Sequence, residues 1–265
     1  MARLDVVLDV ETIGPPWTDL DESTREYLAV RAYRDEWQRL DADRRDAIIR
    51  DGDERVDRTA LELGLCEVIA VGLWLVKEDR GLAFVRAADA DAEPYEAVCG
   101  LGPYVVAPER HVLAETWRKL AQCGTRGSGL RLVTFRGRRF DLPVLGIRSA
   151  QLGLKPTVNP APYRYDVSDH CDLADILDFQ GAAGSGYTLA YWCDRFNIEN
   201  PKAEGVDGGN VGEHWRRGEL DVVATYVLRD VRAEAGLFRR LAPTLIAHLR
   251  GGAGVDVGTA VPAGV

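Results

Sequence analysis

The sequence lacks the paired cysteine spacings that a disulfide framework or a structural zinc site would need. Its five cysteines are odd in number, scattered along the chain and free of any CxxC spacing: Cys66, Cys99, Cys123, Cys171 and Cys193. We therefore expect reduced thiols, most of them buried in the core of the protein.

Long apolar runs are also missing. No stretch approaches the roughly 20 consecutive apolar residues that a membrane-spanning helix needs. Near the N-terminus, Asp5 places an acid where a signal peptide would need an apolar segment. These absences predict a protein that has no membrane association and is located in the cytoplasm.

Basic residues are outnumbered by acidic ones. Lysine and arginine total 33 against 42 aspartates and glutamates, which gives a net charge of −9. This balance argues against a protein that coats nucleic acid through a broad basic face. It does not exclude an enzyme that holds only a strand end, because bound cations can invert the local charge of a carboxylate-rich site.

A glycine-rich phosphate loop is absent after the first predicted strand, where a nucleotide-binding α/β protein would need one. The glycine-rich segment 181–186 falls between predicted helices and lacks the lysine of such a loop. We therefore set a nucleotide-binding α/β protein aside.

The hydrophobic pattern predicts an α/β fold in which a mixed β-sheet is flanked by helices. Predicted strands cover residues 4–10, 66–76, 82–86 and 130–135, and residues 82–86 are expected to pair with 66–76 as a hairpin. Predicted helices cover residues 111–123, 140–154, 173–179 and 188–196, and residues 219–249 are expected to form one long helix or two helices joined at Pro243. We expect one domain over residues 1–250, with 18–58 as a charged helical insertion after the first strand and 251–265 as a flexible tail.

Two acids, Asp9 and Glu11, stand at the end of the first predicted strand. Residues two apart on a strand point to the same face of the sheet, so both carboxylates are expected to project together. Hard divalent cations such as Mg²⁺ prefer carboxylate oxygens. The alternative is that the two acids are a solvated surface pair, because Asp-x-Glu triplets are common in proteins.

A third acid, Asp141, follows a predicted strand and a glycine turn at Gly137, at the opening of a helix. Aspartate often caps a helix at this position, and its four lone-pair sites would also let it bind a metal. Further along, Tyr226 and Asp230 are spaced to share one face of the last helix. One turn from a metal-binding carboxylate, the phenol of Tyr226 could orient a metal-bound water molecule. Core packing for the tyrosine and a surface charge for the aspartate are the alternatives.

In this order and context, the segments 8–12, 134–145 and 226–230 resemble the tyrosine branch of the DEDD exonuclease superfamily, and residues 8–240 carry the likeness. The nearest group is the predicted exonucleases related to the proofreading domain of family B DNA polymerases. The resemblance implies a ribonuclease H-like fold and a 3′–5′ exonuclease that releases 5′-mononucleotides from single-stranded nucleic acid, with DNA favoured. It also implies a polymerase or repair partner acting in trans.

By the same resemblance, Asp9, Glu11, Asp141 and Asp230 would bind two divalent cations, Mg²⁺ or Mn²⁺, that clamp the scissile phosphate, and Tyr226 would align the attacking water. Together these five residues form the implied catalytic set.

The chain departs from the family pattern at Arg136, where asparagine is usual. Arg136, Gly137 and Phe140 are the implied substrate-binding residues, and further arginines and a lysine are candidates for contacts to the nucleic-acid backbone: Arg138, Arg139, Arg195 and Lys202. Two alternatives stay open. One is an RNA-trimming exoribonuclease, because recognition of the 2′-hydroxyl decides that preference. The other is a catalytically weak nucleic-acid-binding domain that retains the fold.

Overall fold

The first strand, β1 (Leu4–Ile13), is the element on which the acidic site is built. In the computed structural model, which describes residues 3–252 except 57, 126–128, 185 and 202–205, β1 continues three residues past its predicted end. Val6, Val7 and Leu8 are fully buried, as expected for an aliphatic run in the middle of a sheet. Asp9 and Glu11 follow on this strand and are only partly buried.

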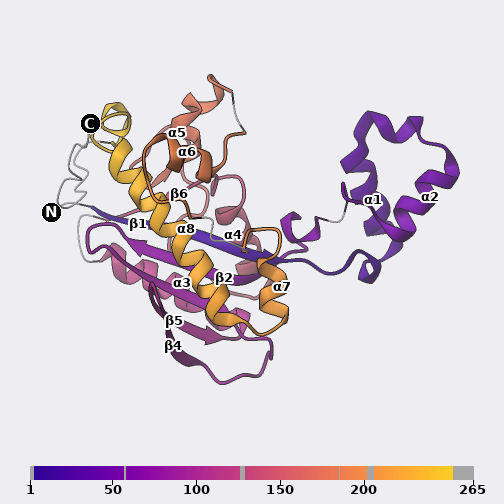
Figure 1. The fold of residues 1–265 in the computed structure, drawn as a ribbon, viewed down its shortest axis with the longest axis horizontal. Helices are drawn as coiled ribbons and strands as arrows, with labels where there is room; N and C mark the ends of the chain where they lie inside the picture. Colours follow the sequence, from indigo (N-terminus) through magenta and orange to yellow (C-terminus); the bar gives the residue numbers. More distant parts are fainter. Residues whose placement is uncertain (1–2, 57, 126–128, 185, 202–205, 253–265) are drawn as a thin grey trace. The chain divides into compact units, whose positions relative to one another are not determined.

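The described residues form a seven-stranded sheet in the order β4-β5-β3-β2-β1-β6-β7 (Figure 1). Its other strands are β2 (Glu67–Leu75), β3 (Arg80–Arg86), β4 (Tyr95–Cys99), β5 (Gly102–Ala107), β6 (Leu130–Thr134) and β7 (His170–Asp172). β2 and β3 pair in antiparallel fashion, which confirms the predicted hairpin. β6 lies parallel to both β1 and β7, so the carboxyl ends of these three strands lie at one edge of the sheet.

Helices flank this sheet, so the predicted mixed α/β architecture is confirmed. They are α3 (Glu109–Gly124), α4 (Asp141–Gln151), α5 (Leu173–Leu177), α6 (Leu189–Arg195), α7 (Val211–Arg216) and α8 (Leu220–Leu241). Pro143 stands in the first turn of α4, where its missing amide is tolerated. α8 ends two residues before Pro243, which has no amide hydrogen and so cannot donate the next hydrogen bond of the helix.

α8 packs closely against one face of the sheet (Figure 1). A Cβ atom built on Gly72 of β2 would lie only 2.8 Å from Cγ2 of Val227, so the glycine allows the helix to approach the strand. The buried side of α8 includes Tyr226, Val227 and Glu234. This packing carries Tyr226 and Asp230 toward the acids of β1.

Residues Thr12–Glu67 form a second compact unit, which includes the predicted helical insertion at 18–58. Its main helices are α1 (Glu22–Tyr33) and α2 (Ala42–Asp51). Asp21 and Asp41 cap these helices by accepting hydrogen bonds from the amides of Thr24 and Arg44. The unit has its own apolar cluster, made of Trp17, Leu28, Ala29, Tyr33, Trp37, Ile48 and Val56.

All five cysteines are buried, and none of them forms a disulfide with another described residue, as the sequence predicted. Among the helices of the described part of the chain, none combines the length and apolarity that a membrane span requires. Most of the predicted tail, residues 253–265, lies outside the described residues.

Candidate metal centre

Asp9, Glu11 and Asp230 come together at the carboxyl end of β1. Each of the three side chains offers a carboxylate oxygen, and these oxygens lie within 4.8 Å of one another. The two β1 acids share a face of the strand, as their spacing predicts. The third comes from α8, more than 200 positions further along the chain. All three side chains are partly exposed, so the group is open to a ligand.

Asp141 lies beside this group but is not a member of it. The side chain is 4% exposed, and its Oδ1 accepts a hydrogen bond from the amide of Val10 at 2.9 Å. The Asp141 carboxyl also lies within hydrogen-bond reach of Asp9. The alternative role as a helix cap does not apply, because Phe140 takes the N-cap position of α4 and no side chain caps the helix. Asp141 therefore joins the start of α4 to the end of β1.

Tyr226 lies one turn before Asp230 on α8 and is 8% exposed. Burial raises the pKa of its phenol well above the ordinary value, and the charges of Glu11 and Asp230 raise it further. The hydroxyl is within hydrogen-bond reach of Asp230. It therefore keeps its proton at any physiological pH and acts as a hydrogen-bond donor.

Crowding and burial make the carboxyl groups of this centre hard to ionise. Burial raises the pKa of Asp9 to about 6, although the hydrogen bonds that Asp9 accepts from the Val10 amide, Glu11 and Asp141 partly oppose this effect. Burial, followed by the charges of neighbouring acids, also raises the pKa values of Glu11 and Asp141 well above their ordinary range. A bound cation would reverse these shifts by compensating the negative charge.

The donor set fits hard divalent cations. Its side-chain ligands are all carboxylate oxygens, which Mg²⁺ and Mn²⁺ prefer over nitrogen or sulfur. Oδ2 of Asp9 is buried and receives no hydrogen bond from any described residue. A buried carboxylate oxygen without a donor is costly unless a cation or a proton compensates it. The residues present therefore suit a divalent metal centre.

Glu234 is a fifth acid near this group, and the sequence reasoning missed it. It lies one turn after Asp230 on α8 and is 1% exposed, and its Oε2 has no hydrogen-bond partner among the described residues. Burial raises its pKa well above the ordinary value, and the charges of Asp9, Asp141 and Asp230 add to the shift. The spacing of four residues between Tyr226, Asp230 and Glu234 was the signal that could have identified it.

The turn before Asp141 is held in place by Asp172, at the end of β7. The Asp172 carboxylate accepts hydrogen bonds from the backbone amides of Arg136 at 2.9 Å and Arg138 at 3.0 Å. A Cβ on Gly137 would lie 2.5 Å from Cβ of Thr134, so the tight turn requires glycine there. The role of Gly137 in the structure is therefore to let the backbone of the turn approach the Thr134 side chain closely.

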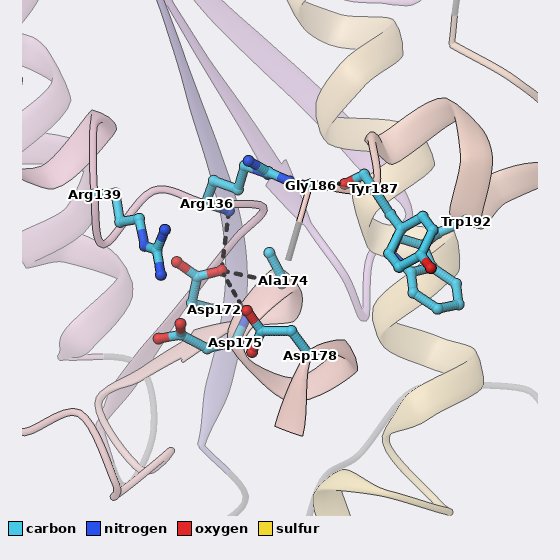
Figure 2. A pocket seen from close by; sticks show the side chains of 9 residues that line it. All are labelled: Arg136, Arg139, Asp172, Ala174, Asp175, Asp178, Gly186, Tyr187 and Trp192. Atoms are coloured by element: carbon cyan, nitrogen blue, oxygen red, sulfur yellow. Dashed lines mark hydrogen bonds between the residues drawn. The ribbon is translucent and has the colours of Figure 1, made fainter. Parts of the chain in front are cut away.

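Arg136 has a φ of 67°, in the left-handed region that asparagine and glycine adopt more readily than arginine. Its guanidinium donates a hydrogen bond to the carbonyl oxygen of Tyr187 at 3.0 Å (Figure 2). The side chain therefore ties the turn to the segment that precedes α6. Phe140, the other implied substrate-binding residue, is half-buried at the N-cap of α4.

The remaining basic residues predicted to contact the nucleic-acid backbone differ in whether their charged groups already have partners in the protein. Arg138 forms an ion pair with Asp175 at 3.1 Å and also donates to the carbonyl of Pro162, so the fold already uses its guanidinium. Arg139 is exposed, and the Arg195 guanidinium lies 5.6 Å from the centre of the Tyr191 ring. Lys202 lies outside the described residues.

The chain matches the family described as "Predicted 3'-5' exonuclease related to the exonuclease domain of PolB" over residues 60–243. Asp141, Tyr226 and Asp230 lie inside this range, and Asp9 and Glu11 precede it. The structure is also similar to the family B DNA polymerase from the hyperthermophilic archaeon Pyrobaculum calidifontis, with a TM-score of 0.53 and 16% sequence identity. That match covers 92% of this chain and 25% of the polymerase chain, so the chain spans a quarter of its length.

At this identity the likeness to the polymerase shows the fold alone, and it agrees with the predicted ribonuclease H-like arrangement. No curated protein sequence matches the chain.

Proposed function

The chain belongs to the family of predicted 3′–5′ exonucleases related to the exonuclease domain of PolB, and from this we propose that it hydrolyses phosphodiester bonds at the 3′ end of single-stranded nucleic acid. We favour DNA as the substrate and 5′-mononucleotides as the products. The observation that carries the proposal is the group formed by Asp9, Glu11 and Asp230, with carboxylate oxygens within 4.8 Å of one another.

In this proposal Asp9, Glu11, Asp141 and Asp230 hold two divalent cations, Mg²⁺ or Mn²⁺. When bound, such ions neutralise the scissile phosphate and lower the pKa of a water molecule. Asp141 uses Oδ1 to accept the Val10 amide, which leaves Oδ2 for a cation and fixes the direction in which it points. The backbone hydrogen bond thus preorganises the ligand.

Tyr226 is proposed to orient the attacking water by donating its hydroxyl proton in a hydrogen bond. The water gives up a proton to solvent as its oxygen attacks phosphorus, the bond from phosphorus to the 3′-oxygen of the preceding nucleotide breaks, and that oxygen takes up a proton from solvent. The raised pKa of Tyr226 means that its phenol is a poor base, so it positions the water and does not deprotonate it.

A 5′-labelled single-stranded oligonucleotide incubated with Mg²⁺ or Mn²⁺ tests the proposal. We expect a ladder of products shortened one nucleotide at a time from the 3′ end, and no ladder from the Asp9→Ala, Glu11→Ala double variant. A matched variant, Glu93→Ala, Glu96→Ala, replaces two exposed acids and should keep full activity. Shortening by the first double variant at the parental rate would refute the assignment of these residues.

A matched RNA strand in the same assay decides the sugar preference, because faster RNA shortening would favour the exoribonuclease alternative. Arg136, with its left-handed backbone, is the observation that keeps the catalytically weak alternative open. Under that alternative the protein would bind the strand without shortening it. Since the similar structure is a polymerase, we also propose a polymerase or repair partner acting in trans.

A further inference from the structure

Three aromatic side chains cluster on the surface at the start of α6. The Tyr187 and Tyr191 rings stack with centroids 4.7 Å apart and planes 23° apart. Trp192 meets both rings edge-on, at 5.5 Å and 5.2 Å. Tyr187 is 48% exposed and Tyr191 is 40% exposed. Packing against the core therefore does not account for the stacked pair, which offers aromatic surface to solvent.

This aromatic cluster adjoins the metal centre. Arg136 joins it to the turn before Asp141 through the hydrogen bond to the Tyr187 carbonyl. Arg136, Tyr187 and Trp192 line one pocket together with Asp172, as Figure 2 shows. The charge of Asp172 contributes to the raised pKa of Asp141, so the pocket lies within electrostatic range of the acids.

The aromatic cluster also lies near the metal centre on the side of α8. α6, which carries Tyr191 and Trp192, packs against α8. Its buried Cys193 has a raised pKa to which the charge of Asp230 contributes. The aromatic cluster is therefore close to the carboxylates from both the α4 side and the α8 side.

Charge decides which part of a nucleotide could occupy this place. The pocket is also lined by three carboxylates. Asp175 is paired with Arg138 and Arg164, whereas Asp172 and Asp178 would disfavour a phosphate and tolerate an uncharged base. Two further arginines lie near the aromatic rings. Arg139 is exposed on the same pocket, and Arg195 lies over the Tyr191 ring. Bases would thus meet the aromatic rings while the arginines accompany the phosphates.

We propose that Tyr187, Tyr191 and Trp192 form a stacking surface for unpaired bases of a single-stranded nucleic acid, next to the metal centre. The inference rests on the proposed function, because it identifies where the substrate strand lies. Stacking tolerates every base, so this surface suits an enzyme that removes nucleotides regardless of sequence. The hydrogen bond from Arg136 gives the unusual arginine a role, because it fixes the aromatic segment beside the turn.

Binding of a fluorescent oligonucleotide, followed by anisotropy in Ca²⁺, tests the surface separately from hydrolysis. We expect the Tyr187→Ala, Tyr191→Ala variant to bind roughly tenfold more weakly or worse, the effect typical of lost base stacking. The Tyr187→Phe, Tyr191→Phe variant keeps both rings and should bind like the parent. Tyr95→Ala is the matched control, because Tyr95 is 51% exposed on β4, at the opposite edge of the sheet from β7.

An oligonucleotide with abasic 3′-terminal positions gives an independent reading on the unaltered protein. We expect it to bind roughly tenfold more weakly than the intact strand, and the alanine variant to lose little further affinity. Equal binding of abasic and intact strands would overturn the stacking surface. So would parental affinity of the alanine variant, which would leave the aromatic cluster to a protein partner. If these binding contrasts hold while neither Mg²⁺ nor Mn²⁺ supports shortening, the exonuclease proposal fails and the stacking surface stands.

Discussion

Tyr226 and Glu234 lie one turn on either side of Asp230, and both are almost fully buried. Burial acts on the two groups in the same chemical direction, because in each case it disfavours the charged form. The phenol thereby remains a donor, and the Glu234 carboxyl tends to keep its proton next to the other acids. One face of α8 thus presents, in order, the Tyr226 phenol as a hydrogen-bond donor, Asp230 as a candidate metal ligand, and Glu234 as an acid that favours its protonated form.

Replacing Tyr226 with phenylalanine removes the hydroxyl and keeps the ring in its packed site. We expect kcat to fall roughly 10- to 100-fold, since a hydrogen bond involving a charged group is worth about 1.5–3 kcal/mol. KM should change little. The alkaline limb of the pH–rate profile should keep its position, because the raised pKa of the phenol excludes its titration there. A shift of that limb in the variant would contradict the assigned role.

Glu234→Gln should stabilise the metal-free protein at neutral pH. The folded state holds the proton of Glu234 at pH values where the unfolded chain has released it, so stability falls as pH rises above the ordinary pKa of 4.5. An amide removes that penalty. We expect thermal unfolding at pH 7 to shift upward by at least roughly 2–4 °C, the shift that about 1 kcal/mol gives in a chain of this size.

The control for this variant is Glu96→Gln, at an exposed position of β4, which should leave the unfolding temperature unchanged. A loss of stability in Glu234→Gln at pH 7 would mean that the ionised carboxylate is needed in the fold.

At the scale of elements, Asp172 connects three parts of the fold that surround the centre. Its carboxylate accepts hydrogen bonds from amides of the 136–138 turn and from the amides of Ala174 and Asp175 at the start of α5. The residue itself ends β7. Nearby, His170 bonds to Thr134 through Nε2 at 2.9 Å, and burial lowers its pKa to about 3, so it stays neutral. Both side chains act here by hydrogen bonding.

Asp172→Asn keeps the size of the side chain but halves its acceptor oxygens. We expect a loss of about 1–3 kcal/mol in the free energy of unfolding, because at least one of these partly buried backbone amides would lose its partner. Denaturant unfolding measures this loss. Asp41→Asn is the matched control. Asparagine caps a helix as well as aspartate does, so the α2 cap should tolerate that change. Equal stability of the two variants would show that the turn does not depend on Asp172.

At the scale of the whole molecule, the acids of the centre oppose folding when no cation is bound. The raised pKa of Asp9, at about 6, means that between about pH 4 and 6 the folded chain retains a proton that the unfolded chain has lost. Stability should therefore fall as pH rises through this window. Carboxyls with lowered pKa values, such as Asp21, titrate below it and do not mask the effect.

We therefore expect the metal-free protein to unfold at a lower temperature at pH 7 than at pH 5, and Mn²⁺ to restore stability at pH 7. Saturation at about 100 times the dissociation constant would add about 2.7 kcal/mol, or roughly 5–10 °C for a chain of this size. The Asp9→Ala, Glu11→Ala variant should show a smaller fall, because Asp141 and Glu234 remain, and no Mn²⁺ response. An equal Mn²⁺ response in that variant would place the cation elsewhere.

Periodicity in the sequence predicted the elements that are long or strongly patterned. β1, β2, β3 and β6 were expected close to their observed bounds, as were α3, α4 and the greater part of α8. β4, β5, β7 and α7 were not predicted. β7 has three residues, too few for an alternating pattern, and most of β4 is exposed. Such strands form because neighbouring strands offer hydrogen bonds, which a local pattern does not reveal.

The sequence by itself determined that Asp9 and Glu11 share a face of a strand, and that Tyr226 and Asp230 share a face of a helix, because local backbone geometry sets both relations. Only the tertiary structure decided that Asp230 meets the β1 acids, that Asp141 bonds to the Val10 amide, and that Glu234 is buried among them. These contacts span more than 100 positions along the chain, and they depend on how α8 and α4 pack against the sheet. Burial and charge, which set the chemistry of each carboxyl, arise only from that packing.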